Sequence, residues 1–337
     1  MAGLRKILIS GVFSAACLSA VILPRAASAQ VTIGYENNGA DPWMVSQSLG
    51  LFDKMIPGGV KLVYFDSGPA AMSALASNSL QFMCGIGVPP FVAAVSQGLP
   101  LAIIYNQERY TSAAGIVVRP GAGINAVADL AGKKIAIVQG SQASFELATF
   151  LGEAGVPFNS VGEINMSPPE MRVAWETKSI DAAIVWDPVF GALAASGGKV
   201  LKTDADLPMD ASSYNVCIAD THWVKAHPQA TVAFVKALDA GVTFTKKNPQ
   251  KALALMASAA GIDNATAATE LKGYQIFSAA DQSTPAVLGS GAGIAKSGTT
   301  QTLNNTATVL IKIGRITAPL SNASAAVDPD FAVQAAK

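Results

Sequence analysis

An apolar run that ends in an aromatic residue and a carboxylate is the first feature of this sequence that could do chemistry. The segment "IDAAIVWDPVF", residues 180–190, reads as a buried strand followed by Pro188, which suits the first turn of a helix. Trp186 and Asp187 therefore mark the boundary between strand and helix. There Asp187 could cap the helix and Trp186 could fill a core, or both could face a ligand.

Polar or helix-starting residues follow the other predicted strands in the same way. In an open α/β sheet the ligand crevice lies outside the carboxyl ends of the strands. Amides at helix N-termini favour anionic groups, so these positions could bind a small ligand, although turn chemistry alone also favours Ser, Asn and Gly there. Besides Trp186 and Asp187, the strand-end candidates are Glu36, Asn37, Asn38, Ser67, Gly68, Val88, Pro89, Gln139, Ser141 and Gln142.

Two segments of the chain resemble each other. Residues 65–98 align with residues 165–198, and each segment reads as strand, turn, helix, polar turn, strand, proline and helix. An apolar strand running into a polar turn precedes each segment, at 31–38 and at 133–144. Unrelated strand-helix units can share such turn and proline positions by chance, but the repeat favours two similar α/β lobes. Alternation of strands and helices predicts parallel sheets with helices on both faces.

Two extended stretches, residues 113–123 and 212–223, separate the predicted lobes. We expect them to be paired hinge strands, the first leaving lobe one and the second returning to it. The mostly helical C-terminal part would then complete the first lobe. The expected division is residues 30–117 and 218–337 for lobe I and residues 118–217 for lobe II.

The first 29 residues predict a secretory signal peptide. They have a charged start, a short apolar segment and an A-x-A site that ends at Ala29. A lipoprotein anchored at Cys17 is the alternative, but more apolar sequence follows that cysteine. Beyond residue 29 no apolar stretch reaches the roughly 18 residues of a membrane span. We therefore expect an exported mature chain that does not insert into the membrane.

Charge and cysteine content narrow the partners further. The chain has 23 basic and 23 acidic residues, which gives no basic excess for nucleic acid. Cys84 and Cys217 could pair in an oxidising compartment or remain separate buried residues. One pair is no disulfide framework, and both lie in apolar runs, so we expect them to be unpaired. Nothing in the sequence argues for an oligomer, so we expect a monomer.

Three segments carry a resemblance to a known family. They are "FDSGPAAMSALASNSLQF" (65–82), "VAWETKSIDAAIVWDPVFGAL" (173–193) and "VKAHPQATVAFVKAL" (224–238). They resemble the taurine, alkanesulfonate and nitrate group of periplasmic solute-binding proteins of ABC importers, and most closely the taurine-binding proteins. The resemblance implies a two-lobed type II binding-protein fold that closes on a small molecule. It also implies an ABC permease and its ATPase as partners.

The resemblance also bears on the ligand. Taurine-binding proteins typically have Ser-Ser-Pro where this chain has Val88-Pro89-Pro90, and an aspartate where it has Asn215. A small sulfonate or amine-containing solute such as taurine is the expected ligand. Nitrate, a pyrimidine precursor, another small nitrogen compound or a sensor role are the alternatives. The remaining candidate ligand-binding residues are Trp43, Glu108, Tyr214 and Asn215.

Catalytic motifs are missing from the sequence. His222 and His227 lie at the start of a predicted helix, away from the strand ends, and neither G-x-S-x-G nor H-E-x-x-H occurs. Residues 290–297 resemble a phosphate-binding loop, but Ser290 and Ala295 occupy the positions where that motif needs glycine, and no strand precedes the segment. A thiamine-precursor synthase shares the expected fold class but needs a cysteine-rich stretch and histidines that are absent here. We expect a binding protein without catalytic residues, metal or cofactor.

Overall fold

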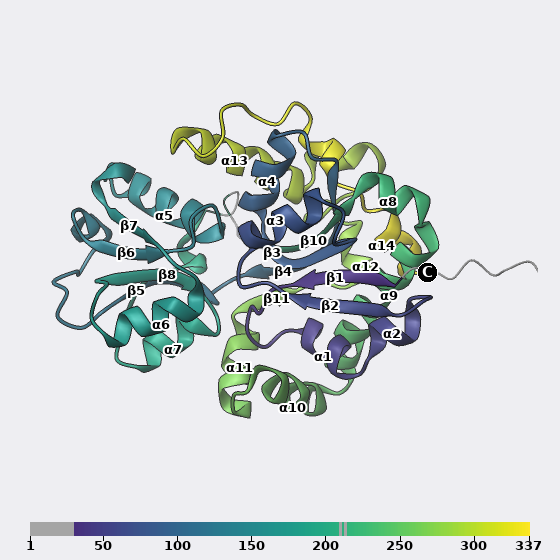
Figure 1. Ribbon diagram of the computed structural model, residues 1–337, viewed down its shortest axis with the longest axis horizontal. Coiled ribbons are helices and arrows are strands. Elements are labelled where there is room, and N and C mark those ends of the chain that lie inside the picture. Colours follow the sequence, from purple (N-terminus) through teal and green to yellow (C-terminus); the bar gives the residue numbers. More distant parts are fainter. Residues whose placement is uncertain (1–29, 209–210, 212–213) are drawn as a thin grey trace, which may run out of the picture.

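The computed structural model describes residues 30–208, 211 and 214–337, so the expected signal peptide lies outside the described residues. Figure 1 shows two α/β bodies side by side, each built on its own sheet. Within the described ranges no helix combines the length and apolar character needed to cross a membrane.

The first body contains a six-stranded sheet in the order β11-β4-β10-β3-β1-β2. Its strands are β1 (Val31–Tyr35), β2 (Val60–Tyr64), β3 (Phe82–Gly87), β4 (Leu101–Tyr110), β10 (Tyr214–Asp220) and β11 (Tyr274–Ile276). Its N-terminal helices are α1 (Pro42–Ser48), α2 (Leu51–Met55), α3 (Gly68–Ala76) and α4 (Val88–Ser96). Its C-terminal helices are α8 (Thr221–Ala226), α9 (Pro228–Lys247), α10 (Pro249–Ala260), α11 (Asn264–Lys272), α12 (Ala279–Gln282), α13 (Gly298–Lys312) and α14 (Asp330–Ala335).

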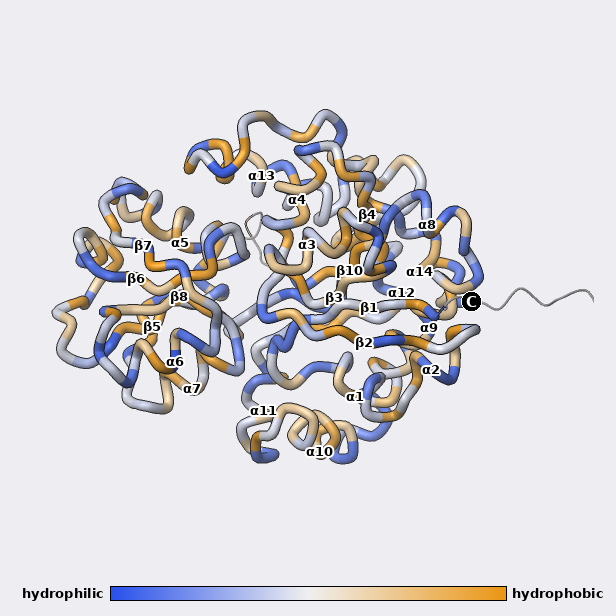
Figure 2. The backbone as a smooth tube through the Cα atoms, in the orientation of Figure 1, coloured by the Kyte–Doolittle hydropathy of each residue, from blue (hydrophilic) through white to orange (hydrophobic). Residues whose placement is uncertain are grey.

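The second body contains a five-stranded sheet in the order β7-β6-β8-β5-β9. Its strands are β5 (Ala114–Val118), β6 (Lys134–Ile137), β7 (Gly162–Asn165), β8 (Ala182–Trp186) and β9 (Lys199–Thr203). Its helices are α5 (Gln142–Glu153), α6 (Pro168–Glu176) and α7 (Val189–Ala195). Every residue of β5 and β8 is buried, and Figure 2 shows hydrophobic colour on these strands with hydrophilic colour gathered in the outer connections.

The expected internal repeat is confirmed by the topology. The strand order β2-β1-β3-β10 in one sheet matches β7-β6-β8-β5 in the other. The turns between helix and strand also match, because Asn78 (φ 56°) and Lys178 (φ 60°) occupy equivalent left-handed positions. In each turn the next serine donates its N–H to an alanine carbonyl, from Ser79 at 2.9 Å and from Ser179 at 3.0 Å. The α/β prediction with helices flanking each sheet therefore holds.

The sheets are mixed rather than wholly parallel. Strands β1, β2 and β3 run parallel, as do β6, β7 and β8. However, β10 is antiparallel to β3 and β4, and β5 is antiparallel to β8 and β9. The expectation of parallel sheets fails at these strands, because the chain enters each from the other body and not through a strand-helix-strand unit.

The expected pairing of two hinge strands is wrong. The first stretch forms β5, which joins the second sheet, whereas the second stretch contains β10, which joins the first sheet. The chain crosses from the first sheet to the second between Tyr110 and Ala114 and returns between Thr203 and Tyr214. Each stretch pairs with strands of its destination because those strands offer the buried backbone groups it must satisfy.

The expectation that the two mature-chain cysteines remain unpaired is also wrong. Cys84 on β3 and Cys217 on β10 form a disulfide, and both residues are fully buried. The two strands are neighbours in the first sheet, which brings the Cα atoms within 4.1 Å. Residues 133 positions apart in the sequence thus become adjacent only through the sheet order.

Candidate functional site

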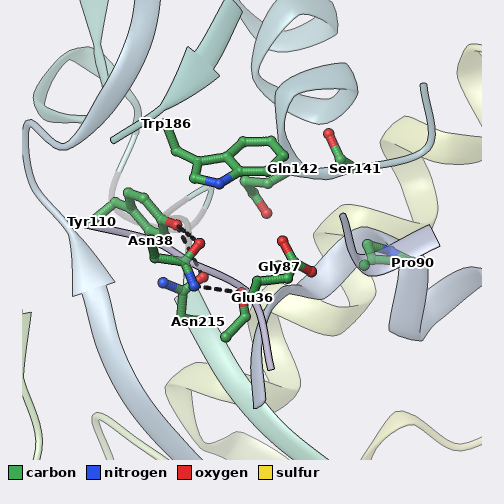
Figure 3. Close-up of a pocket in the computed structure, with 11 residues that line it drawn as sticks. Glu36, Asn38, Gly87, Pro90, Tyr110, Ser141, Gln142, Trp186 and Asn215 are labelled. Carbon is green, nitrogen blue, oxygen red and sulfur yellow. Dashed lines mark hydrogen bonds between the residues drawn. The ribbon is translucent and has the colours of Figure 1, made fainter. Parts of the chain in front are cut away.

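A pocket lies where the two bodies meet. The residues that line it are Glu36, Asn38, Gly68, Gly85, Gly87, Pro90, Tyr110, Ser141, Gln142, Trp186 and Asn215. In Figure 3 Trp186 and Gln142, from the second body, face Glu36 from the first body across the pocket. The space not filled by atoms, including the part open to solvent, is about 230 Å³.

Glu36 supplies a buried carboxylate to the pocket. It follows β1 directly, where the backbone N–H of Glu36 donates to the Cys84 carbonyl at 3.2 Å and so continues the pairing with β3. The side chain is 6 % exposed, and its Oε1 has no hydrogen-bond partner. Burial raises the pKa of Glu36 well above its usual value, with a further contribution from the nearby charge of Asp66. Burial therefore disfavours the charged form of Glu36, and a ligand that donates hydrogen bonds to it would stabilise the carboxylate.

Helix N-termini supply the groups that suit an anion. Gly68 is the first residue of α3, Gly87 precedes α4, and Ser141 precedes α5; all three line the pocket. The first two helix starts receive no capping hydrogen bond from a side chain. None of the lining residues is lysine or arginine. An anionic ligand group would therefore depend on backbone amides, helix dipoles and hydroxyl or amide side chains.

A buried hydrogen-bond network fixes the floor of the pocket. The Tyr110 hydroxyl shares its one hydrogen between two acceptors, Asn215 Oδ1 at 3.0 Å and Asn38 Oδ1 at 3.2 Å. The Asn38 side-chain amide donates to the Gly85 carbonyl at 2.8 Å, and Asn215 Nδ2 donates to Glu108 Oε1 at 2.7 Å. Each amide is thus held in one orientation, which presents a defined set of donors and acceptors to the pocket.

Trp186 and Asp187, the pair that ends β8, have different surroundings. Trp186 is 6 % exposed, packs into the core of the second body and also lines the pocket. Asp187 does not line the pocket, because its Oδ1 accepts from the Gly191 N–H at 2.9 Å and caps the first turn of α7. Burial raises the pKa of Asp187 to about 7, and the charges of Glu270 and Asp204 contribute to the increase.

Some of the candidate ligand-binding residues from the sequence line the pocket, and others do not. The candidates that line it are Glu36, Asn38, Gly68, Ser141, Gln142, Trp186 and Asn215. Those that do not line it are Asn37, Trp43, Ser67, Val88, Pro89, Glu108, Gln139, Asp187 and Tyr214. Most of the second group sit next to a lining residue in the sequence, since consecutive residues at a strand end point in different directions.

Several candidates outside the pocket have clear structural roles. Trp43 stacks between Tyr35 and Phe52 in the core of the first body, with ring centroids 5.5 and 4.6 Å away. Val88 is fully buried inside α4. Tyr214 stacks on Phe277, at 6.3 Å between centroids.

The other candidates outside the pocket hold its surroundings in place. Asn37 Oδ1 accepts from the Gly39 N–H at 3.0 Å. Ser67 is the residue before α3, and Pro89 lies in the first turn of α4. Glu108 contacts the pocket through Asn215, and Gln139 precedes the loop that carries Ser141.

Gly85, Gly87, Pro90 and Tyr110 line the pocket but were missed from the sequence. The sequence does offer a reason to select Gly87, because a glycine at a strand end permits another segment to approach closely. A Cβ atom there would lie 2.8 Å from the Gln142 Cβ in the other body. Pro90 directly follows the candidates Val88 and Pro89. Tyr110 ends a long strand and carried no comparable signal.

The chain is similar to known proteins both in sequence and in fold. The family model described as NMT1/THI5 like matches residues 42–252. The taurine-binding periplasmic protein of Escherichia coli (strain K12) is 30% identical over 222 residues, which are 66% of this chain and 68% of that protein. The alkanesulfonate-binding protein SsuA from Xanthomonas axonopodis pv. citri, solved bound to MOPS, is similar with a TM-score of 0.74 and 22% identity, covering 90% of this chain and 99% of that one.

An enzyme has the same fold. The desulfurization enzyme DSZB is similar with a TM-score of 0.61 and 15% identity, covering 91% of this chain and 99% of that one. At such identities the likeness to both solved structures concerns the fold alone.

Proposed function

Because the chain belongs to the NMT1/THI5-like family, we propose that it is the periplasmic substrate-binding component of an ABC transporter. It captures a small sulfonate or amine-containing solute, such as taurine, between the two bodies and delivers it to the permease. The taurine-binding relative supports this function, and so does a pocket lined from both bodies.

The observation that carries the proposal is the unpartnered Oε1 of Glu36 in a pocket lined by helix N-termini. An ammonium group on Glu36 would complete the hydrogen bonding of the buried carboxylate, with each charged hydrogen bond contributing about 1.5–3 kcal/mol. The amides that start α3 and α4 would receive the acidic group of the same solute. The indole of Trp186 offers an apolar or cation-binding face beside them.

Binding would work through closure of the bodies as two lobes. In this proposal lobe I is the first body, lobe II is the second body, and the two crossings of the chain are the hinge. The expected boundaries at residues 117 and 217 move to these crossings, because β5 (Ala114–Val118) belongs to the second sheet and β10 (Tyr214–Asp220) to the first. A ligand that touches both lobes stabilises the closed state over the open state. The closed shape is then the signal for the permease.

The alternatives differ in what they would leave unpaired. Nitrate has no donor for Glu36, so it would leave the buried acid unsatisfied. A pyrimidine precursor could donate to Glu36 and stack on Trp186, which makes it the stronger alternative. Presentation of the ligand to a sensor would use the same pocket.

We propose binding without turnover, since no residue of the pocket is a nucleophile beside a general base.

Thermal-shift and calorimetric titration of the mature protein test the proposal. We expect taurine to raise the melting temperature more than ethanesulfonate, which lacks the amine, and more than nitrate. In the Glu36→Gln variant this preference for the amine should shrink at least tenfold, while the variant stays folded. Binding of nitrate or of a pyrimidine alone would contradict the proposal, and so would chromatographic detection of a product from any bound solute.

A further inference from the structure

We propose that Glu163 and Arg315 form a latch between the two bodies, which strengthens ligand binding without touching the ligand. Both are positioning residues in this inference, which rests on the proposed function for the identity of the bound solute. The pair lies outside the set of residues that line the pocket.

The ion pair joins elements that are remote in the sequence. Glu163 lies on β7, at the edge of the second sheet, and Arg315 follows α13 of the first body. Arg315 Nη2 lies 2.8 Å from Glu163 Oε2, and the side chains are 30% and 13% exposed. Among the described residues this is the one ion pair that connects the two bodies. The others, Arg119–Asp181, Lys202–Asp206 and His222–Asp220, each lie within one body.

Arg315 is held firmly on its own body. Its N–H donates to the Leu310 carbonyl at 2.8 Å, which fixes the turn after α13. The next residue, Ile316, is 7% exposed and packs into the core of the first body. Helix α13 packs on α4 of the same body and on α5 of the other, and Figure 1 shows it reaching toward the second body. The guanidinium is therefore presented to the second body from a rigid support.

Glu163 is connected to the loop that carries pocket residues. The Gln139 side-chain amide donates to Glu163 Oε2 at 3.4 Å, and the Gln139 N–H donates to Asn165 Oδ1 at 2.9 Å. Two residues later Ser141 lines the pocket and precedes α5. One carboxylate oxygen thus receives donors from the loop before Ser141 and from Arg315.

The latch contributes only when the bodies are close. Any hinge motion that separates β7 from the end of α13 breaks the 2.8 Å contact and returns both charges to water. The interaction therefore stabilises the closed state relative to the open state. Since a solute that contacts both bodies binds the closed state, its apparent affinity increases in proportion to the fraction of the ligand-free protein that is closed.

A double-mutant cycle on the mature protein tests the latch. The variants are Glu163→Gln, Arg315→Gln and the double variant, with affinity for the best solute measured by calorimetry. We expect each single change to weaken binding about three- to tenfold, and the double change to weaken it no further than one single change. High salt should reduce the difference from the wild type, because partly exposed charges are screened.

Asp181→Asn is the matched control. Asp181 pairs with Arg119 at 3.7 Å at similar exposure, but within the second body, so this variant should bind like the wild type. Wild-type affinity in Glu163→Gln, additive effects in the double variant, or an equal loss in Asp181→Asn would each overturn the latch.

Small-angle scattering of the ligand-free protein separates failure of the latch from failure of the proposed function. Both single variants should have a larger mean radius of gyration than the wild type and the Asp181→Asn control. If no tested solute binds the wild type, the proposed function fails and this comparison decides the latch by itself. An unchanged radius in both variants would then overturn it.

Discussion

Glu108 lies one hydrogen bond behind the pocket. Its Oε1 accepts from Asn215 Nδ2 at 2.7 Å, and Asn215 lines the pocket while Glu108 does not. The Tyr110 hydroxyl donates to the other side of the same amide, at Asn215 Oδ1. Glu108 and Tyr110 together fix which atom of Asn215 points in which direction, so we expect Glu108 to act on a ligand through Asn215.

Replacement of Glu108 by Gln and by Leu separates orientation from charge. Gln keeps an acceptor for Asn215, so we expect affinity within about threefold of the wild type. Leu leaves a buried amide donor unpaired, at a cost of about 1–3 kcal/mol, so we expect at least tenfold weaker binding. Calorimetry measures both, with circular dichroism as the check on folding. An equal loss in both variants would show that the Glu108 charge acts on the ligand directly.

The substitution Gly87→Ala adds a Cβ atom where the two bodies meet. The added Cβ would meet the Gln142 Cβ at 2.8 Å, closer than carbon atoms normally approach. The backbone at Gly87 has φ −69°, which alanine adopts without strain, so the first body should fold normally in the variant. We expect affinity to fall about tenfold or more, measured by calorimetry, with little change in the melting temperature of the empty protein. Wild-type affinity would mean that the bodies need not approach this closely.

The sequence predicts pocket residues best where the end of a single strand determines their position. Glu36 and Trp186 each follow or end a strand, and both line the pocket. The contact between Asn215, which lines the pocket, and Glu108 behind it could not be predicted in the same way. Both residues were candidates, but they are 107 residues apart and meet only because β10 lies beside β4.

The cysteine pair was missed for the same reason. Cys84 and Cys217 are ordinary apolar strand residues until β3 and β10 are known to be neighbours. Strand order is a property of the whole chain, since it depends on how both crossings between the bodies are made. Local patterns therefore predicted the fold class and the repeat, but neither the mixed sheets nor the disulfide.

Asp187→Asn should change how stability depends on pH. Burial raises the pKa of Asp187 from 3.8 to about 7, so between these values the native protein holds a proton that the unfolded chain has lost. This contribution to stability is complete below pH 4 and disappears as the pH increases through 7. Asn cannot ionise and caps a helix as well as Asp does. We therefore expect the variant to become more stable than the wild type by about 1–4 kcal/mol at pH 8.

Denaturant unfolding of both proteins at pH 4 and pH 8 measures this effect. Near pH 4 the two should differ little, because Asp187 is then neutral in the native protein. A constant difference at both pH values would contradict the raised pKa and assign the change to packing.

The disulfide should stabilise the first body without acting on the ligand. Neither Cys84 nor Cys217 lines the pocket, and the bond closes a loop with a sequence separation of 133 residues. Chain entropy in the unfolded state predicts a contribution of about 4–5 kcal/mol for a loop of this size. We expect the Cys84→Ala, Cys217→Ala double variant to have a free energy of unfolding lower by about this amount, measured by denaturant unfolding, with ligand affinity within about threefold of the wild type.

Wild-type protein unfolded with a reductant present should resemble the variant, because reduction also removes the cross-link from the unfolded chain. Equal stability of the variant and the oxidised wild type would show that the bond contributes nothing to folding, and a large loss of affinity would show that β3 and β10 need the bond to hold Gly85 and Asn215 in place.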